Sequence, residues 1–414
     1  MRGSAGNRVL MLLENCGYPR DTRVRREATA LVDAGYRVSV ICPADAGQPR
    51  HEILDGVAVY RYPAPPDGQG LLGYAREYGQ SLAASFVLSL YVLFRRGFDV
   101  VHAHNPPDTF VFIAALYKLL GKRFVFDHHD LSPEMYYARF PGKGNRLVYR
   151  ALVLLEKLSC RLADHVIATN QSYRAVETER GGVPPERITI VRNGPNPDRL
   201  RPVEPDPDLR ANAPTIIGFG GTIGYQDGVE YLVRALARLV HDLGRTDVFC
   251  VVVGTGDALA DVRALATRLG LDEYIRFTGW VSDADYLRYL STADICVVPD
   301  PSNPFTDRST MIKMSEYMAL AKPVVAFDLP EHRFTAQDAA LYAPPNDELE
   351  LARAIARLMD DPERRRMMGE LGRRRVEAQL AWSFSVPNLL MAYRAVLPRA
   401  AASLGHSGVR DAIR

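Results

Sequence analysis

Histidines and aspartates gather at two places in the first half of the sequence. His102 and His104 are two residues apart on a run expected to be extended, where alternate residues share one face. A second group reads Asp127-His128-His129-Asp130. Neutral imidazoles and carboxylates bind metal ions, so a metal site is one interpretation. Contact of one or two of these histidines with a substrate is a second interpretation, and a purely structural role is a third.

Two glycine-rich segments in the second half are of the kind that approaches phosphates. The segment 218–224 follows one apolar run, and Gly254-Thr255-Gly256-Asp257 follows the next. Glycines at a strand-to-helix turn let a phosphate reach backbone N–H groups, although a plain tight turn explains either segment as well. The first segment carries Ile223 where a dinucleotide fingerprint needs glycine, and it lacks the acidic ribose partner about 20 residues on. A nicotinamide cofactor is therefore disfavoured and a nucleoside diphosphate is favoured.

A third polar group lies in the segment 307–319, for which the pattern predicts a helix with Asp307 near its N-terminus. Arg308, Lys313 and Glu316 are charges among apolar neighbours. Lys313 and Glu316 are three residues apart and can share one helix face. A surface ion pair, which contributes little stability, is the alternative to a binding role.

The elements that position these groups alternate between strand-like and helix-like patterns. Nearly continuous apolar runs predict strands buried on both faces, at 8–13, 36–42, 57–61, 99–103, 123–127, 165–168 and 188–191, and again at 215–219, 248–253, 275–278, 295–298, 323–327 and 341–343. Helical patterns such as 20–34 and 107–120 lie between most of them. This alternation predicts α/β domains with doubly wound parallel sheets, whose ligands lie at the carboxyl ends of the strands.

The proline-rich stretch from Pro202 to Asp208 cannot be a helix interior or a central strand, so we expect it to separate two domains. The predicted organisation is a first Rossmann-like domain at 1–204, a linker at 205–213 and a second Rossmann-like domain at 214–380. A helix and a loose tail at 381–414 are expected to return to the first domain.

Charge is balanced overall and uneven along the chain. The 414 residues carry a net charge of +2, too little for a dedicated nucleic-acid binder. Residues 1–207 hold 27 basic and 22 acidic residues, a balance of +5, so an anionic partner would prefer this half. In the segment 143–164, the cations Lys143, Arg146, Arg150, Lys157 and Arg161 share one sector of a helical wheel beside an apolar stripe. This distribution predicts docking on an anionic membrane, with a solvated core helix as the alternative.

Cysteine usage indicates the compartment. Five scattered cysteines, and a start without the apolar core of a signal peptide, indicate a cytoplasmic location, with peripheral attachment to the inner face of the plasma membrane if the helix docks. The longest uncharged run, Tyr78 to Phe94, falls short of the ~20 apolar residues that a spanning helix needs. It is either a buried helix or a helix inserted into one membrane face.

Five short stretches together resemble the family 4 glycosyltransferases over nearly the whole chain. They lie at 19–24, 191–194, 277–281, 316–319 and 322–326, and they read PRDTRV, VRNG, FTGWV, EYMA and KPVVA. The resemblance is closest to the branch that builds bacterial surface polysaccharides and lipid-linked oligosaccharides. It implies the GT-B fold, in which two Rossmann-like domains face an interdomain cleft.

The resemblance also implies the substrates and the reaction. A nucleotide-sugar donor, UDP- or GDP-linked, would bind the second domain, and a glycan or lipid-diphosphate-linked acceptor would bind the first. Transfer would retain the anomeric configuration, with the departing phosphate oxygen accepting the proton of the acceptor. No metal and no further cofactor is required by this scheme, and no nucleic acid is a partner.

Carried over residue by residue, the resemblance assigns roles. Glu316 matches the glutamate that grips the ribose hydroxyls, and Arg308 stands where the family has its first glutamate. The family's basic loop residue is also absent at 225–228, so Arg308 and Lys313 are expected to stabilise the leaving diphosphate. His129 and Asp130 match a pair whose histidine contacts the donor sugar near the reacting carbon. Further donor contacts are expected from Gly220, Gly221, Thr222, Gly254, Gly256, Asp257 and Val281, and acceptor contacts from Asn15, Arg23, His104, Asn105 and His128.

Two alternatives to transfer stay open at this point. Arg308 in place of a glutamate is compatible with a nucleotide-sugar protein of this fold that does not transfer, either an epimerase-type enzyme or a binding subunit. Asp127-His128-His129 also resembles part of the signature of DHH-type phosphoesterases, although the early strand ends in Leu13-Glu14-Asn15 rather than in an Asp-x-Asp.

Overall fold

The computed structural model describes residues 7–66, 70–140, 142 and 144–397, and it divides into two compact units. Unit 1 holds the described residues of Met1–Pro133, Gly144–Arg192 and Ser385–Arg414, and unit 2 holds those of Glu134–Lys143 and Asn193–Phe384. Both units are α/β folds with a mainly parallel sheet, as the alternation predicted. Lys143 and the tail at 398–414 lie outside the described residues.

Unit 1 is built on an eight-stranded sheet in the order β3-β4-β2-β1-β5-β6-β7-β8. The strands are β1 Arg8–Leu12, β2 Arg37–Ala44, β3 His51–Leu54, β4 Val57–Pro63, β5 Val100–His104, β6 Arg123–His128, β7 His165–Ala168 and β8 Ile188–Ile190. Every neighbouring pair is parallel except β3 with β4. The sequence analysis missed β3, because this edge strand is four residues long and only half-buried.

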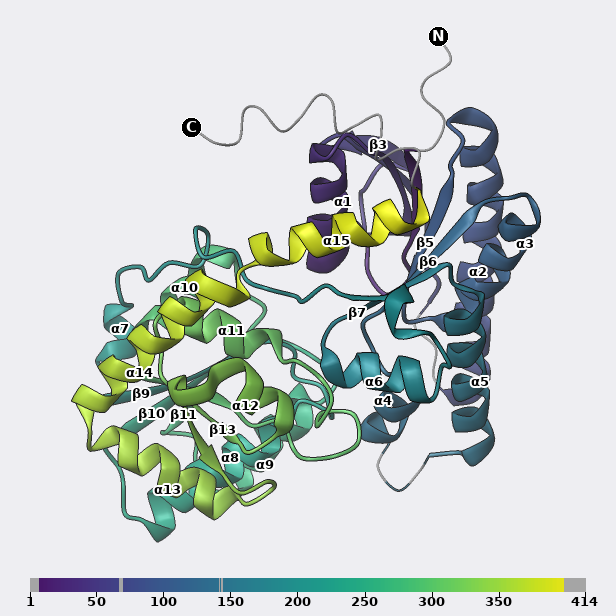
Figure 1. The fold of residues 1–414 in the computed structure, drawn as a ribbon. Coiled ribbons are helices and arrows are strands. Elements are labelled where there is room, and N and C mark those ends of the chain that lie inside the picture. Colours follow the sequence, from purple (N-terminus) through teal and green to yellow (C-terminus); the bar gives the residue numbers. More distant parts are fainter. Residues whose placement is uncertain (1–6, 67–69, 141, 143, 398–414) are drawn as a thin grey trace, which may run out of the picture. The chain divides into compact units, whose positions relative to one another are not determined.

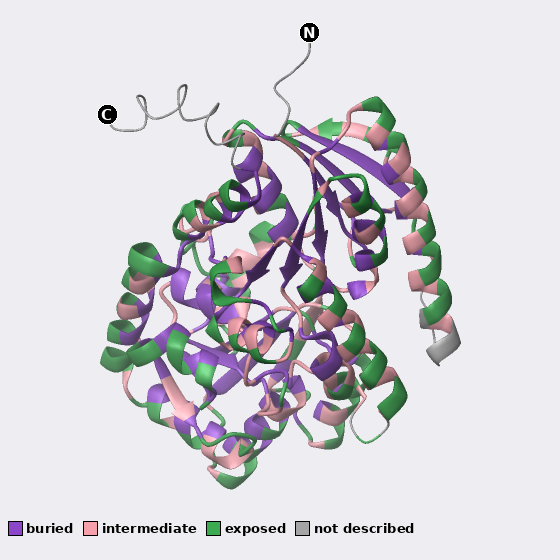
Figure 2. Ribbon diagram, turned by 45° about the vertical axis from the view of Figure 1, so that its right-hand side comes forward, coloured by how far each residue is buried: buried purple, intermediate pink, exposed green. Residues whose placement is uncertain are grey.

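Helices cover both faces of this sheet. They are α1 Thr22–Asp33, α2 Gly70–Arg95, α3 Val111–Leu119, α5 Arg146–Leu162, α6 Gln171–Glu179 and α15 Trp382–Val396, whereas α4 Ser132–Arg139 belongs mostly to unit 2. Helices α2, α3 and α5 lie on one side of the sheet, and α1 and α15 lie on the other (Figure 1). The strands between them are almost entirely buried, which explains their continuous apolar runs (Figure 2).

Unit 2 has a six-stranded, fully parallel sheet in the order β11-β10-β9-β12-β13-β14. The strands are β9 Thr215–Gly220, β10 Val248–Val253, β11 Ile275–Gly279, β12 Ile295–Val298, β13 Val324–Phe327 and β14 Ala340–Ala343. The helices are α7 Pro207–Arg210, α8 Val229–Ala237, α9 Leu259–Arg268, α10 Asp283–Thr292, α11 Ile312–Ala319, α12 Pro330–Ala336, α13 Glu348–Met359 and α14 Pro362–Arg375.

Each sheet has a point where the strand order reverses, and ligands of open α/β sheets bind there. In unit 1 the reversal lies between β1 and β5, so the segments after these strands, beginning at Leu13 and Asn105, flank it. In unit 2 it lies between β9 and β12, so the segments beginning at Gly221 and Pro299 flank it. The polar groups at 218–224 and 307–311 lie in these segments, whereas the groups at 127–130 and 254–257 follow the neighbouring strands β6 and β10.

Two local expectations differ from the structure. The helix expected near Asp307 begins only at Ile312, because the Asn303 carboxamide oxygen accepts from the backbone N–H groups of Phe305 and Thr306 and holds a turn instead. The boundary between the units lies at Arg192, before the predicted linker. The proline-rich segment belongs to unit 2 because its backbone at Val203 and Asp206 is bonded to hydroxyls of α10.

Helix α15 is fixed to unit 1 by buried polar contacts. The Tyr393 hydroxyl and His102 Nδ1 share a hydrogen bond of 2.7 Å, and both side chains are fully buried. Ser385 Oγ donates to the Arg192 carbonyl, and Asn388 Nδ2 donates to the Ile190 carbonyl. The last described helix thereby closes the face of the sheet that α1 also covers.

We expect Tyr393→Phe to loosen α15, because it leaves His102 Nδ1 buried without a partner at a cost of about 1–3 kcal/mol. Faster hydrogen–deuterium exchange of the α15 amides would report the loss. The matched control is Tyr225→Phe, which removes an exposed hydroxyl bonded to Asp261 and should change exchange little. Equal exchange of α15 in the parent and in Tyr393→Phe would contradict the prediction.

Candidate active site

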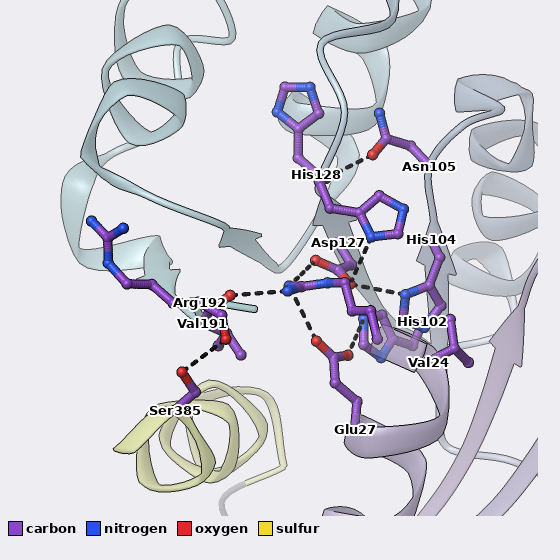
Figure 3. A network of polar contacts seen from close by, with 12 residues as sticks. Val24, Glu27, His102, His104, Asn105, Asp127, His128, Val191, Arg192 and Ser385 are labelled. Atoms are coloured by element: carbon purple, nitrogen blue, oxygen red, sulfur yellow. Dashed lines mark hydrogen bonds and ion pairs between the residues drawn. The ribbon is translucent and has the colours of Figure 1, made fainter. Parts of the chain in front are cut away.

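A buried ion pair lies at the carboxyl end of β6 in unit 1. The guanidinium of Arg23, on α1, donates to both carboxylate oxygens of Asp127 at 2.7 and 2.6 Å and to the Val191 carbonyl at 3.0 Å (Figure 3). Its Nη2 also lies 3.1 Å from Glu27 Oε1, one helical turn further along α1. Burial opposes ionisation of Asp127, but the charge of Arg23 and the hydrogen bond with His104 hold its pKa well below the usual range.

The two histidines of β5 complete this network. His104 Nδ1 lies 2.8 Å from Asp127 Oδ2, and His102 Nε2 lies 3.8 Å from Glu27 Oε2. Burial, followed by the charge of Asp127, raises the pKa of Glu27 to about 7, while burial and the proximity of His104 lower the pKa of His102. The expected sharing of one face by His102 and His104 is seen directly in their ring contact.

This network contains the chain's metal-like constellation. Ligand atoms of Glu27, His102, His104 and Asp127 lie within 4.8 Å of one another. The donor set suits a divalent ion by type, but Arg23 already occupies both carboxylates and would repel a cation. The residues present therefore fit a charge-compensated structural network better than a metal centre.

Asn105 holds the turn that carries the two residues after β6. Its side-chain oxygen accepts from the backbone N–H groups of His129 and Asp130 at 2.8 and 3.1 Å. Its amide nitrogen donates to the Asp130 carbonyl and to the Asp108 carboxylate. Because Asn105 is buried and fully engaged, this turn has little freedom to move.

His129 is the histidine of this group that keeps some access to solvent. Its side chain is 11 % exposed, whereas those of His104 and His128 are fully buried. Burial lowers the pKa of His129 in spite of Asp127, so the ring is neutral near pH 7. Burial and the charge of Asp21 raise the pKa of Asp130 to about 7.

The predicted acceptor-side set is mostly not available to an acceptor. His128 is directed into the fold, with Nδ1 3.2 Å from Glu177 and Nε2 3.6 Å from Glu156. Arg23, His104 and Asn105 are buried in the contacts described above. Asn15, after β1, is the exposed member of the predicted set. The other four residues are buried and bonded to neighbouring groups, so direct acceptor contact by them stays a prediction.

In unit 2 the two glycine loops after β9 and β10 pack on each other. The Gly221 N–H donates to the Val253 carbonyl, and the Ile223 N–H donates to the Thr255 carbonyl. A side chain at Gly254 would collide with the Gly221 carbonyl, and one at Gly256 would collide with the Ile223 carbonyl. The packing of one loop on the other therefore requires glycine at both positions. From the sequence, these glycines were expected for a different reason, the close approach of a phosphate.

The other predicted donor contacts in these loops lie at varied depths. Gly220 is buried against the Tyr286 ring, Val281 is half-buried, and Thr222 is exposed. Asp257 is exposed and forms an ion pair of 2.9 Å with Arg139 of α4. Of this set, Thr222 and Asp257 are the exposed residues.

Lys313, which is expected from the sequence to stabilise the leaving diphosphate, is paired with two carboxylates of unit 2. Its Nζ lies 2.9 Å from Asp300 Oδ1 and 3.2 Å from Asp227 Oδ1, and it also lies over the Phe219 ring. Burial opposes its charge, but the two carboxylates raise its pKa. Lys313 thus joins α11 to the segments on both sides of the strand-order reversal, and it does not pair with Glu316.

Glu316 lies one turn further along α11 and is half-buried. Its Oε2 accepts a hydrogen bond of 3.0 Å from the Tyr286 hydroxyl of α10. Arg308 is also partly exposed, and one of its guanidinium nitrogens donates to the Pro304 carbonyl. Glu27 and Tyr286 were missed from the sequence. Glu27 carried a signal, since it is four residues from Arg23 on one helix.

Two known protein families match two successive segments of the chain. The family described as Glycosyltransferase Family 4 matches residues 21–199, and the one described as Glycosyl transferases group 1 matches residues 214–361. The chain belongs to the family 4 glycosyltransferases. This glycosyltransferase is 24% identical over 355 residues to the 2-deoxystreptamine glucosyltransferase of Streptomyces kanamyceticus, covering 82% of this chain and 89% of that protein.

Solved structures show the same GT-B fold. Sucrose-phosphate synthase from Thermosynechococcus elongatus has a TM-score of 0.76 at 21% identity, covering 95% of the glycosyltransferase and 100% of that chain. The Anabaena protein HepE, in complex with UDP and glucose, has a TM-score of 0.67 at 18% identity, covering 92% and 98%. The named relatives are transferases or synthases and do not favour the non-transferring or phosphoesterase alternatives.

We expect Asn105→Ala to lower the turnover of the glycosyltransferase about 10²-fold, because a shift of about 1 Å in a reacting group costs that much. The donor KM should change little, since unit 2 is untouched. Steady-state kinetics with varied donor separates the two constants. Asn170→Ala is the matched control, because Asn170 is another buried asparagine, which caps α6 through the Tyr173 N–H. Parent-like turnover of Asn105→Ala would contradict the positioning role.

Proposed function

We propose that this glycosyltransferase uses a nucleotide-sugar donor, UDP- or GDP-linked, and that unit 2 binds it. The observation that carries the proposal is Glu316, which lies half-buried on α11 with one oxygen oriented by Tyr286. A carboxylate has about four lone-pair sites, so it can accept from a ribose diol while keeping the tyrosine. The HepE structure in complex with UDP and glucose supports a donor of this class.

For the leaving diphosphate we propose Arg308 and the backbone of the β9 loop. Negative charge develops on the leaving group, and prearranged donors there contribute strongly to rate. Arg308 is partly exposed, whereas the charge of Lys313 is already compensated by Asp227 and Asp300. In this proposal Lys313 orders the loop that the donor meets, and Arg308 contacts the phosphates.

We propose further that His129 acts at the donor sugar and that transfer retains the anomeric configuration. A neutral imidazole can donate a hydrogen bond to a sugar hydroxyl or accept one from it. Asn105 fixes the backbone of His129 by accepting from its N–H group. Asp130, with its raised pKa, is beside it on the same turn. The departing phosphate oxygen then takes the proton of the acceptor, without a metal or a further cofactor. An NMR assignment of the product's anomeric proton tests the stereochemical outcome.

The acceptor we propose is a glycan or a lipid-diphosphate-linked saccharide in polysaccharide synthesis, reached from the cytoplasmic side of the membrane. Asn15 is exposed at the strand-order reversal of unit 1, where such an acceptor would bind. The cations of α5 support a partner with negative charge. A transfer assay against lipid-diphosphate-linked and free glycans distinguishes the two acceptor classes.

We expect Glu316→Gln to raise the donor KM or lower kcat/KM about 10²-fold, because two hydrogen bonds to a charged group contribute about 3 kcal/mol or more. Isothermal titration with the nucleotide alone measures the binding part. Glu348→Gln, an isosteric change on α13, should leave both constants unchanged. If Glu316→Gln binds nucleotide and transfers like the parent, the ribose role is wrong.

We expect Arg308→Glu to lower kcat more than the affinity for free nucleoside, because the reversed charge would meet the leaving diphosphate. The variant restores the glutamate of the family, so the sign of its effect is informative. Single-turnover kinetics with saturating donor isolates the chemical step. The matched control, Arg364→Glu, reverses an exposed charge on α14. A rise in turnover for Arg308→Glu would reject the phosphate role.

A further inference from the structure

Helix α2 has its polar and apolar faces reversed. Ser81, Ser85 and Ser89 face inward and are buried, and Ser89 Oγ bonds to the Tyr117 hydroxyl of α3. Val92 is buried as well, but Phe94 is 84 % exposed, and Val87 and Tyr91 are exposed on the same helix. A helix that only covers a sheet buries its apolar stripe and exposes its polar one.

Helix α5 shows the same reversal. Its buried residues are Glu156, Ser159 and Cys160, and both oxygens of Glu156 bond to Arg180 at 2.7 and 2.6 Å. Leu147 is 72 % exposed, and Leu154 and Leu158 are exposed with it. The fully buried residues of α5 are thus two polar side chains and a cysteine, whereas three of its leucines are exposed.

Helix α3 lies between these two helices and joins their outward faces. Its Tyr117 contacts Ser89 of α2, and Lys118 Nζ donates to the Leu162 carbonyl of α5. Its end exposes Leu119, 85 % accessible, and the following Leu120. All three helices lie on one side of the unit 1 sheet (Figure 1), and we take the apolar residues exposed on them together as one surface.

We call this surface the three-helix face. Its apolar members are Val87, Tyr91, Phe94, Phe112, Leu116, Leu119, Leu120, Leu147, Leu154 and Leu158. Within the described part of the chain, 19 large hydrophobic residues are exposed, and these ten are more than half of them. Scattered single exposures are normal, but a contiguous group of this kind marks an interaction site.

Cations accompany the apolar residues. Arg146, Arg150, Lys157 and Arg161 of α5 form no ion pair with any residue that the structure describes, and Arg95 ends α2. The acidic residue of α5, Glu156, is buried and neutralised by Arg180. The three-helix face therefore offers positive charge and apolar side chains together.

We propose that the three-helix face docks on an anionic lipid bilayer, with Leu119 and Leu120 inserted at the interface and the α5 cations against the headgroups. Apolar burial combined with attraction to anionic lipid is how interfacial helices bind. No helix among the described residues is long and apolar enough to cross a bilayer, so the contact is peripheral. A second copy of this chain fits less well, because a twofold interface would place these cations against one another.

This docking is independent of the transfer chemistry, and it extends beyond α5 to residues of α2 and α3. The test is co-sedimentation with phosphatidylcholine vesicles containing a rising fraction of phosphatidylglycerol, at low and high salt. We expect binding that grows with phosphatidylglycerol and weakens with salt. Leu119→Asp with Leu120→Asp should lower the partition coefficient at least tenfold. Arg150→Gln with Arg161→Gln should lower it roughly thirtyfold at low salt.

Matched controls separate this surface from general exposure and charge. Ile53→Asp changes a residue of β3 that is as exposed as Leu120, both at 63 %, and Arg364→Gln with Arg374→Gln removes two exposed cations of α14. Neither control should alter vesicle binding, and circular dichroism verifies that all variants are folded. Absent binding to phosphatidylglycerol vesicles, or equal losses in the controls, overturns the proposal. So does a concentration-dependent dimer that the Leu119→Asp, Leu120→Asp variant abolishes.

Discussion

The bidentate ion pair between Arg23 and Asp127 is the interaction on which unit 1 depends. Both groups are buried, and a buried charge is tolerated only with a partner of opposite sign and further hydrogen bonds. Arg23 comes from α1, Asp127 from the end of β6, and the Val191 carbonyl from the segment after β8. Three segments distant in sequence are thereby fixed at one edge of the sheet, and the turn with His129 begins directly after them.

Unit 2 uses the same device with a lysine. Lys313 lies between Asp227 and Asp300 and fixes α11 to the segments after β9 and β12. In both units a cation from a helix is shared by two carboxylates, at least one of which lies at or just after the carboxyl end of a strand. A fixed, neutralised cation orders loops well but offers little charge to a ligand. For this reason we propose that less buried groups near the strand ends, rather than the buried cations themselves, contact the substrate.

The sequence predicted regular elements better than it predicted what their side chains face. Strands such as β7 and β10 have the predicted bounds, because a short continuous run of apolar, β-branched residues is typical of a parallel strand buried on both faces. The helix at Asp307 failed because Asn303, several residues upstream, holds the local backbone in a turn. The burial of Arg23 and Lys313 could not be predicted from local spacing, since each is also paired with a carboxylate more than 80 residues away, Asp127 and Asp227 respectively.

The polar contacts made by the inward sides of α2 and α5 explain why the apolar residues of the three-helix face point outward. Ser81 of α2 donates to Glu14, the residue before Asn15, and Glu156 of α5 lies 3.6 Å from His128, the residue before His129. Polar side chains on these helices are thus required beneath the strand ends, where buried carboxylates and imidazoles need partners. Several apolar residues of each helix then lie on its outer side, where they contact water unless a partner covers them. The polar layer that supports the candidate site and the apolar surface that covers unit 1 are consequences of one arrangement.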